Sequence, residues 1–150
     1  MTEVELKTFI DVVINYFEQI TSESCSMGIP YTRTNDPIVL EYTGLIGISG
    51  SRKGGIYITS KTPMLADLAS IMLDLPQSEV DSEIIIDSIG ELANTIAGNV
   101  RKSFGSSFMI SVPIILKGSP DDIIMKLSPP VFIIPILWRD HQAFLSVGLE

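Results

Sequence analysis

The sequence contains few of the residues that usually build a metal site or a nucleophilic active site. It has one cysteine, Cys25, and one histidine, His141. A single cysteine excludes an internal disulfide and a thiolate metal cluster. A single histidine, placed in a predicted turn between strands, is typical of a solvated turn residue rather than a zinc ligand. It also leaves Ser-His-Asp and Cys-His nucleophilic sites without a recognisable motif.

Basic residues and long apolar runs are also scarce. The chain has 10 Lys and Arg against 18 Asp and Glu, a net charge of −8. Nucleic acids select basic surfaces, so this balance argues against a nucleic-acid partner. Apolar runs such as Val131–Trp138 are too short to span a bilayer, and the acidic start at Met1 lacks the form of a signal peptide. We therefore expect a cytoplasmic protein without a membrane segment.

What the chain does have is enough apolar sequence to build a core and three helical patterns. Apolar residues make up 45% of 150 residues, so we expect a single domain over residues 1–150. Apolar residues recur at a helical period over Thr2–Ile20, with Thr2 and Glu5 spaced as a capping box. A second helix is predicted to open at Lys61-Thr62-Pro63, and a third to run from about Ser78 or Val80 to Ser103.

The remaining β-rich segments predict strands that glycine and proline separate. They are Ile38–Ser49, Gly55–Ser60, Phe108–Lys117, Asp122–Leu127, Val131–Trp138 and Ala143–Leu149. Gly50–Gly54 indicates a hairpin turn between the first two. Pro113 and Pro135 lie inside strand-like runs and favour edge strands or bulges there. Because helices and strands occur in runs, the expected class is α+β, with helices packed on a largely antiparallel sheet.

The third predicted helix carries the most informative motif, Asp-x3-Glu-x2-Asn-x3-Gly. Its members are Asp87, Glu91, Asn94 and Gly98. In a helix each residue turns by about 100°, so these four fall on one stripe. The roughly opposite face is apolar and consists of Ile85, Ile89, Leu92, Ala93, Ile96, Val100 and Phe104. The helix therefore presents an acid, an amide and a bare glycine on the side facing away from the core.

On spacing alone, this stripe also fits an ordinary solvated helix face. Two features favour a function. Asparagine is a mediocre helix former. Gly90 and Gly98 each cost about 1 kcal/mol relative to alanine inside a helix. Because Gly98 lies beside the polar pair, we interpret the stripe as a surface to which another backbone comes close.

The motif Asp87-x3-Glu91-x2-Asn94-x3-Gly98 resembles the signature helix of the CheC/CheX/FliY family. Its members are phosphatases acting on the phosphorylated chemotaxis response regulator CheY. Softer similarity extends to the first helix, to the strand-then-helix unit from Gly55 to Leu73, and to the closing strands. In the first helix only Asn15 matches, at the position of Asn94. One intact motif is closer to the CheX members than to CheC, where two are usual.

The resemblance implies specific roles. Asn94 would position the attacking water, and Glu91 would pair with the active-site lysine of the regulator. Asp87 and Gly98 would belong to the partner-binding face, with Asp87 not catalytic. The protein would need no cofactor or metal of its own, because Mg²⁺ would arrive on the phosphorylated CheY-like receiver domain.

The resemblance also implies a homodimer formed through sheet edges. The alternative function is a non-catalytic binding module for a receiver domain or for a CheD-like deamidase. A third interpretation is a purely structural dimer domain in a signalling complex, with the polar pair incidental.

Overall fold

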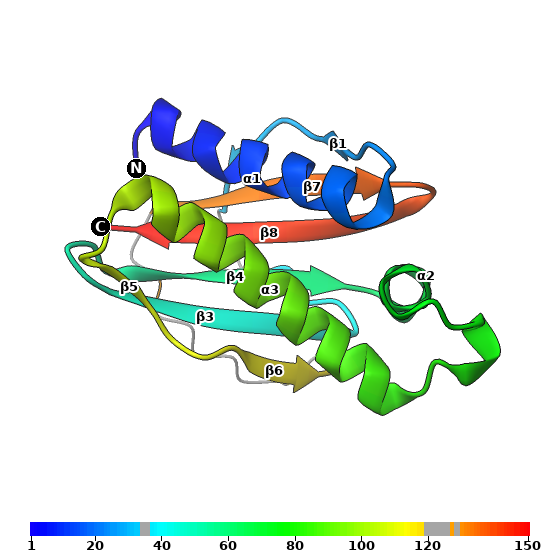
Figure 1. Ribbon diagram of the computed structural model, residues 1–150. Helices are drawn as coiled ribbons and strands as arrows, with labels where there is room; N and C mark the ends of the chain where they lie inside the picture. The colour runs from blue at the N-terminus through cyan, green and yellow to red at the C-terminus, as the bar shows by residue number, and fades with distance from the viewer. Residues whose placement is uncertain (34–36, 119–126, 128–129) are drawn as a thin grey trace.

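Three helices pack on one antiparallel sheet in the computed structural model, which describes residues 1–33, 37–118, 127 and 130–150 (Figure 1). The helical elements are α1 (Glu3–Thr21), α2 (Thr62–Leu73), the 3₁₀ turn η1 (Gln77–Glu79) and α3 (Ser82–Phe104). The strands are β1 (Ser26–Met27), β2 (Tyr31–Thr32), β3 (Tyr42–Gly50), β4 (Gly54–Ser60), β5 (Phe108–Ile110), β6 (Ile114–Lys117), β7 (Val131–Trp138) and β8 (His141–Leu149). The expected α+β class is confirmed.

The order of the described strands is β1-β7-β8-β4-β3-β5, with β2 also pairing with β7 and β6 with β3. Every pair is antiparallel. Helices α1 and α3 lie across the same face of the sheet, while α2 sits at one end (Figure 1). Among the described residues, no helix is both long enough and apolar enough to cross a bilayer.

The ends of α1 and α3 are set by side-chain caps. The predicted capping box is present, since Thr2 N donates to Glu5 Oε1 at 2.8 Å and Glu5 N donates to Thr2 Oγ1 at 3.1 Å. The predicted start of α3 at Ser78 or Val80 is wrong. The Asp81 carboxylate accepts from Ile84 N at 2.9 Å, and this cap requires an extended backbone at Asp81. The helix therefore begins at Ser82, the residue after this cap.

Prolines shape the strands differently from one another. The predicted strand Phe108–Lys117 is two strands, β5 and β6, interrupted before Pro113, which cannot donate to a ladder. Pro135 was expected on an edge strand or at a bulge. It lies instead on β7, which is not an edge strand because β1 and β2 pair with it. The Pro135 carbonyl accepts from Gly28 N at 2.9 Å, so its backbone faces the gap between these short strands, where no donor is needed.

Two other predictions for the sheet have different outcomes. The turn between β3 and β4 is confirmed as a hairpin, in which Gly50 and Gly54 both have positive φ. The predicted strand Asp122–Leu127 lies outside the described residues, apart from Leu127, which belongs to no strand.

The core lies between the helices and the sheet, and α3 approaches the sheet most closely over β3. Gly44 makes this possible, since a Cβ there would lie 3.0 Å from the Ala93 Cβ and 3.3 Å from the Ile89 carbonyl oxygen. Ala93 and Ile89 belong to the buried face of α3. A close, dry contact of this kind fixes the helix and so fixes the direction of its outer face.

We expect Gly44→Val to lower the free energy of unfolding by about 1–3 kcal/mol, because the added side chain would overpack the contact with α3. Gly47→Val is the matched control in the same strand. Among the described residues, a Cβ on Gly47 would meet only the Ser111 side chain, with Oγ at 3.6 Å and Cβ at 3.9 Å, so this variant should change stability little. Chemical denaturation of both variants measures the difference. Equal stabilities would contradict the role given to Gly44.

Candidate functional site on helix α3

The polar stripe predicted for α3 faces outward. Asp87, Glu91 and Asn94 are exposed, and Gly98 is partly exposed. The opposite face is buried and consists of Ile85, Ser88, Ile89, Leu92, Ala93, Ile96, Ala97 and Val100. The predicted division of the helix into a core face and an outward face is therefore confirmed. Ser88 was not predicted to face the core. It can be buried because its hydroxyl donates a hydrogen bond to the Ile84 carbonyl at 2.8 Å.

The side chains of Glu91 and Asn94 retain hydrogen-bonding groups that can contact a bound molecule. Thr95 Oγ1 donates to Glu91 Oε1 at 3.1 Å, which engages one of the two carboxylate oxygens. Within the described part of the chain, the Asn94 carboxamide makes no side-chain hydrogen bond. An amide both donates and accepts, so Asn94 can contact two polar groups of a bound molecule at once.

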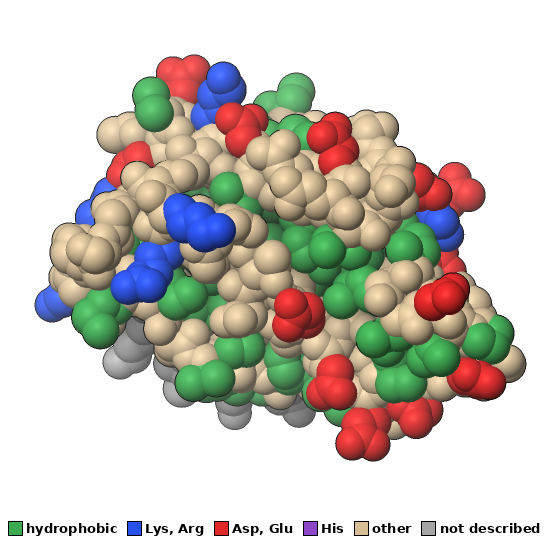
Figure 2. Space-filling view, in the orientation of Figure 1, with side chains coloured by type: hydrophobic (Ala, Val, Ile, Leu, Met, Phe, Trp, Pro, Cys, Tyr) green, Lys and Arg blue, Asp and Glu red, His purple; other side chains and the backbone are tan. Residues whose placement is uncertain are grey.

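An apolar groove with an acidic rim lies beside Glu91. It runs between the end of α2 and the first half of α3, and its lining consists of Met72, Leu73, Ile84, Asp87, Ser88 and Glu91. Leu73 is 52% exposed, so apolar surface is open here. Figure 2 shows acidic side chains beside apolar ones in this region. Such a groove suits a lysine, whose aliphatic stem is apolar and whose head is a cation.

Tyr16 of α1 supports the floor of this region. It is only 3% exposed, and its hydroxyl donates to the Met72 Sδ at 3.7 Å. Burial, and then the negative charge of Glu91, raise the pKa of Tyr16, so its hydroxyl stays neutral. This neighbour could not be predicted from the sequence, because a tyrosine on the buried stripe of α1 has the pattern of any core residue.

The partial match to the motif on α1 provides only an amide. Asn15, which matches Asn94, is exposed. The positions that match Glu91 and Gly98 are Val12, which is partly buried, and Gln19, which is exposed. The α1 face therefore lacks the carboxylate and the bare glycine.

His141 is not the solvated turn residue that the sequence suggested. It begins β8, and its Nε2 lies 2.6 Å from Asp67 Oδ2 of α2. Burial raises the pKa of Asp67, but hydrogen bonds from His141 and Gln77 outweigh it and leave that pKa below its usual value. Arg139 binds Glu23 through two contacts of 2.9 Å. These pairs join the β7–β8 turn to α2 and to the chain after α1.

The only cysteine of the sequence does not offer a reactive thiolate. Cys25 is buried, and burial raises the pKa of its thiol to about 11, so it stays protonated near neutral pH. In the described ranges, no three His, Cys, Asp or Glu side chains gather as a metal site would need. What the α3 surface can do is bind a cation through Glu91 and orient a polar molecule through Asn94.

Comparisons with known proteins agree with the motif. The family model described as "Chemotaxis phosphatase CheX" matches residues 42–137, which include all of α3. No curated protein matches the sequence.

Solved structures share the fold at low identity. A CheC-like superfamily protein from Shewanella sp. PV-4 has a TM-score of 0.85 at 23% identity, covering 100% of this chain and 99% of that chain. CheX from Vibrio vulnificus has a TM-score of 0.83 at 21% identity, covering 97% and 99%. A CheX-CheY-BeF3-Mg²⁺ complex from Borrelia burgdorferi contains a chain with a TM-score of 0.78 at 21% identity, covering 97% of both chains.

We expect Gly98→Ala to stabilise the protein by about 0.5–1 kcal/mol, the helix-propensity difference between the two residues. Among the residues that the structure describes, none lies within 4 Å of a Cβ placed on Gly98, so these residues do not require glycine here. Gly90→Ala is the matched control, since its Cβ would lie 3.5 Å from Ile115 Cδ1, an ordinary contact. Thermal unfolding measures both. A destabilised Gly98→Ala protein would show that the glycine is structural.

Proposed function

Because the chain belongs to the CheX family of chemotaxis phosphatases, we propose that it hydrolyses the aspartyl phosphate of a CheY-like response regulator. The observation that carries the proposal is the exposed Glu91–Asn94 pair, one turn apart on a helix whose other face is core. The relative from Borrelia burgdorferi, whose structure contains CheY, supports a partner of the same class.

The chemistry needs no nucleophile from this chain. A receiver domain carries its phosphoryl group on an aspartate, and the Mg²⁺ and lysine beside that group already stabilise the charge of phosphoryl transfer. We infer that Asn94 holds a water in line with the phosphorus. That water attacks as the bond from phosphorus to the aspartyl oxygen breaks, which releases inorganic phosphate and a free carboxylate. Orienting a nucleophile in this way can contribute several kcal/mol.

Glu91 would anchor the complex. Its carboxylate stands at the rim of the apolar groove, where the stem of a partner lysine could lie against Met72 and Leu73 while the ammonium meets the acid. Asp87 provides a second carboxylate on the same rim. Asp87 and Gly98 thus belong to the partner-binding face rather than to the chemistry.

The acidic balance of the chain is compatible with this substrate. A net charge of −8 would repel a free phosphate ester, which is a dianion near neutral pH. On a receiver domain, the Mg²⁺ and the lysine neutralise much of that charge. We therefore infer that the protein acts on a phosphorylated domain that brings its own metal and not on small phosphate esters.

The alternative is a non-catalytic module that binds a receiver domain or a CheD-like deamidase through the same face. It would use the exposed stripe and the groove in the same way, but without turnover. Measured hydrolysis separates the two functions.

We expect Asn94→Ala to slow dephosphorylation by on the order of 100-fold or more, because the water loses its orientation. The assay follows loss of label from a radiolabelled phospho-receiver with Mg²⁺. Asn15→Ala is the matched control, since Asn15 is also an exposed helical amide but has Val12, and not a glutamate, three residues before it, and it should retain the full rate. A wild-type rate in Asn94→Ala, or no hydrolysis by the wild type with any receiver, would sink the phosphatase proposal.

Two further variants separate binding from chemistry in the same assay. Glu91→Ala should both raise KM and lower kcat, because anchoring and alignment are lost together. Gly98→Ala should raise KM alone if the partner backbone comes close at that point. Gly90→Ala, which faces Ile115 of β6, should leave KM unchanged.

We also infer that the protein forms homodimers through β5 and β6, which form one edge of the sheet among the described strands. Both strands pair with β3 on one side. Large apolar side chains are open here, with Met109 55%, Val112 82% and Ile114 61% exposed. Sheet edges with apolar side chains favour pairing with another chain, and a two-fold dimer would cover both copies of the edge.

We expect Val112→Asp/Ile114→Asp to convert a dimer into a monomer, because two carboxylates cannot be buried without partners. Size-exclusion chromatography with light scattering measures the mass. Val4→Asp is the control, since Val4 is 77% exposed on α1, away from this edge. A monomeric wild type, or equal loss of dimer in the control, would contradict this interface.

A further inference from the structure

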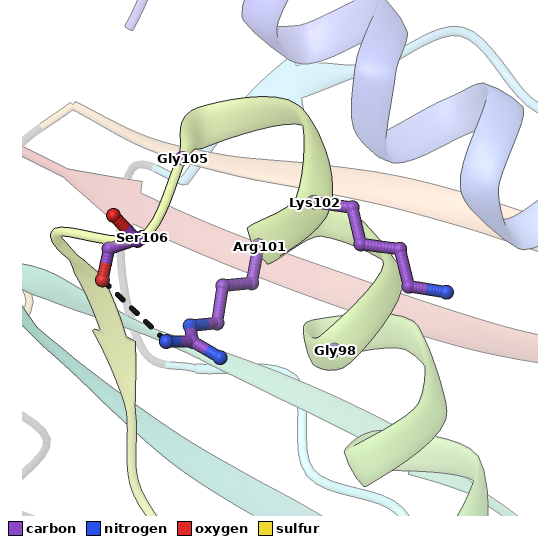
Figure 3. A pocket seen from close by; sticks show the side chains of 5 residues that line it. All are labelled: Gly98, Arg101, Lys102, Gly105 and Ser106. Carbon is purple, nitrogen blue, oxygen red and sulfur yellow. Dashed lines mark hydrogen bonds between the residues drawn. The ribbon is translucent and has the colours of Figure 1, made fainter.

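The last turns of α3 carry the charge opposite to its first half. Acidic side chains gather over the N-terminal half of α3 and basic ones near its C-terminal end (Figure 2). A pocket opens at that basic end, and its lining consists of Gly98, Arg101, Lys102, Gly105 and Ser106 (Figure 3). Gly98 thus belongs both to the Asp-x3-Glu-x2-Asn-x3-Gly motif and to this pocket.

We propose that this basic pocket binds a carboxylate-bearing segment of the same receiver domain whose lysine meets Glu91. The proposal rests on the proposed function and adds a second contact of opposite sign to the docking surface.

The two contacts lie on one stripe. At about 100° and 1.5 Å per residue, Lys102 points within about 20° of Glu91 and lies about 17 Å further along the helix axis. Arg101 lies on the other side of the stripe, next to the direction of Asn94, and Gly98 falls between the two ends. A single partner surface laid along α3 therefore reaches both the acid and the bases.

Both cations are held in place and remain available. Arg101 Nε donates to the Phe108 carbonyl at 2.9 Å and Nη2 donates to the Ser106 carbonyl at 3.4 Å, which fixes the guanidinium against the loop (Figure 3). Lys102 Nζ donates to Asn99 Oδ1 at 3.2 Å and keeps two further donors.

Neither cation has a charged partner in the described part of the chain. Its described ion pairs use other bases, namely Arg52 with Glu5, Arg139 with Glu23 and Asp67, and His141 with Asp67. In a chain with almost twice as many acids as bases, two neighbouring bases without an acid form a local site for an anion.

The surroundings favour a carboxylate on a docked protein over a free anion. The pocket lies at the C-terminal end of a helix, where the backbone dipole disfavours negative charge, so a free anion would be held only weakly. The cations are exposed, so each ion pair made with a small anion in water would be weak. A carboxylate on a partner already held at Glu91 is presented at high effective concentration, and then even weak pairs add to binding.

The arrangement also sets the direction of docking. A partner with its base toward the start of α3 and its acid toward the end is attracted at both contacts. The reverse orientation would bring like charges together at both ends. The stripe therefore selects both the partner and its orientation.

The test is the double variant Arg101→Glu/Lys102→Glu, assayed with a phospho-receiver at several salt concentrations. We expect KM to rise at least tenfold at low salt, with kcat within twofold of wild type, and a smaller dependence of KM on salt. The matched control is Lys7→Glu/Lys61→Glu, which changes net charge equally. Lys7 borders a groove with Pro30, and Lys61 borders a hollow with His141, so neither lines the α3 pocket.

A second measurement keeps this proposal separable from the phosphatase function. Affinity for a receiver domain loaded with beryllofluoride and Mg²⁺ is measured without any turnover. Weaker binding of the α3 double variant, with normal binding of the control, supports the pocket even if Asn94→Ala shows that no hydrolysis depends on the amide. Equal weakening by the control would show bulk charge repulsion instead. Unchanged affinity, a loss of kcat alone, or a loss confined to binding of inorganic phosphate would overturn the proposal.

Discussion

The close contact between α3 and β3 at Gly44 is the constraint from which the candidate site follows. Because Gly44 has no side chain, Ala93 and the Ile89 carbonyl can approach the strand directly. A helix held this tightly has one fixed rotation about its axis, and that rotation turns the Glu91–Asn94 stripe outward. The pair thus gains the fixed orientation that catalysis by positioning requires, without any ligand to hold it.

The two faces of α3 have to satisfy different demands, and the helix meets them at a small cost in stability. Its inner face contributes apolar side chains to the core, which compensates for helix-weakening residues on the outer face. Gly98 shows this division clearly, because no described residue lies within 4 Å of the position that a Cβ would take there. The helix tolerates a residue that its own fold does not need, which makes sense when the outer face serves a partner.

The sequence was sufficient for features that depend on a local period, and insufficient for those that depend on distant neighbours. The outward direction of Asp87, Glu91 and Asn94 followed from helical spacing, and so did the capping box at Thr2. The start of α3 was wrong because a pattern of apolar residues cannot show which residue provides the cap. The groove beside Glu91 depends on where α2 ends in space, and Tyr16 reaches it from a third element. The spacing of residues within one segment cannot predict which residues of other segments will lie beside it.

Charge placement links the fold to the proposed chemistry. Glu83 in the first turn of α3, and Arg101 and Lys102 in its last turn, carry the charges that the helix dipole favours at those ends. The same arrangement gives the outer face a direction. A partner that carries a lysine beside a phosphorylated aspartate would be drawn to the acidic half, where Asn94 stands one turn from Glu91. Under the proposed function, the Mg²⁺ and the lysine that stabilise the reacting phosphoryl group both belong to the partner, so Glu91 and Asn94 only have to anchor and orient.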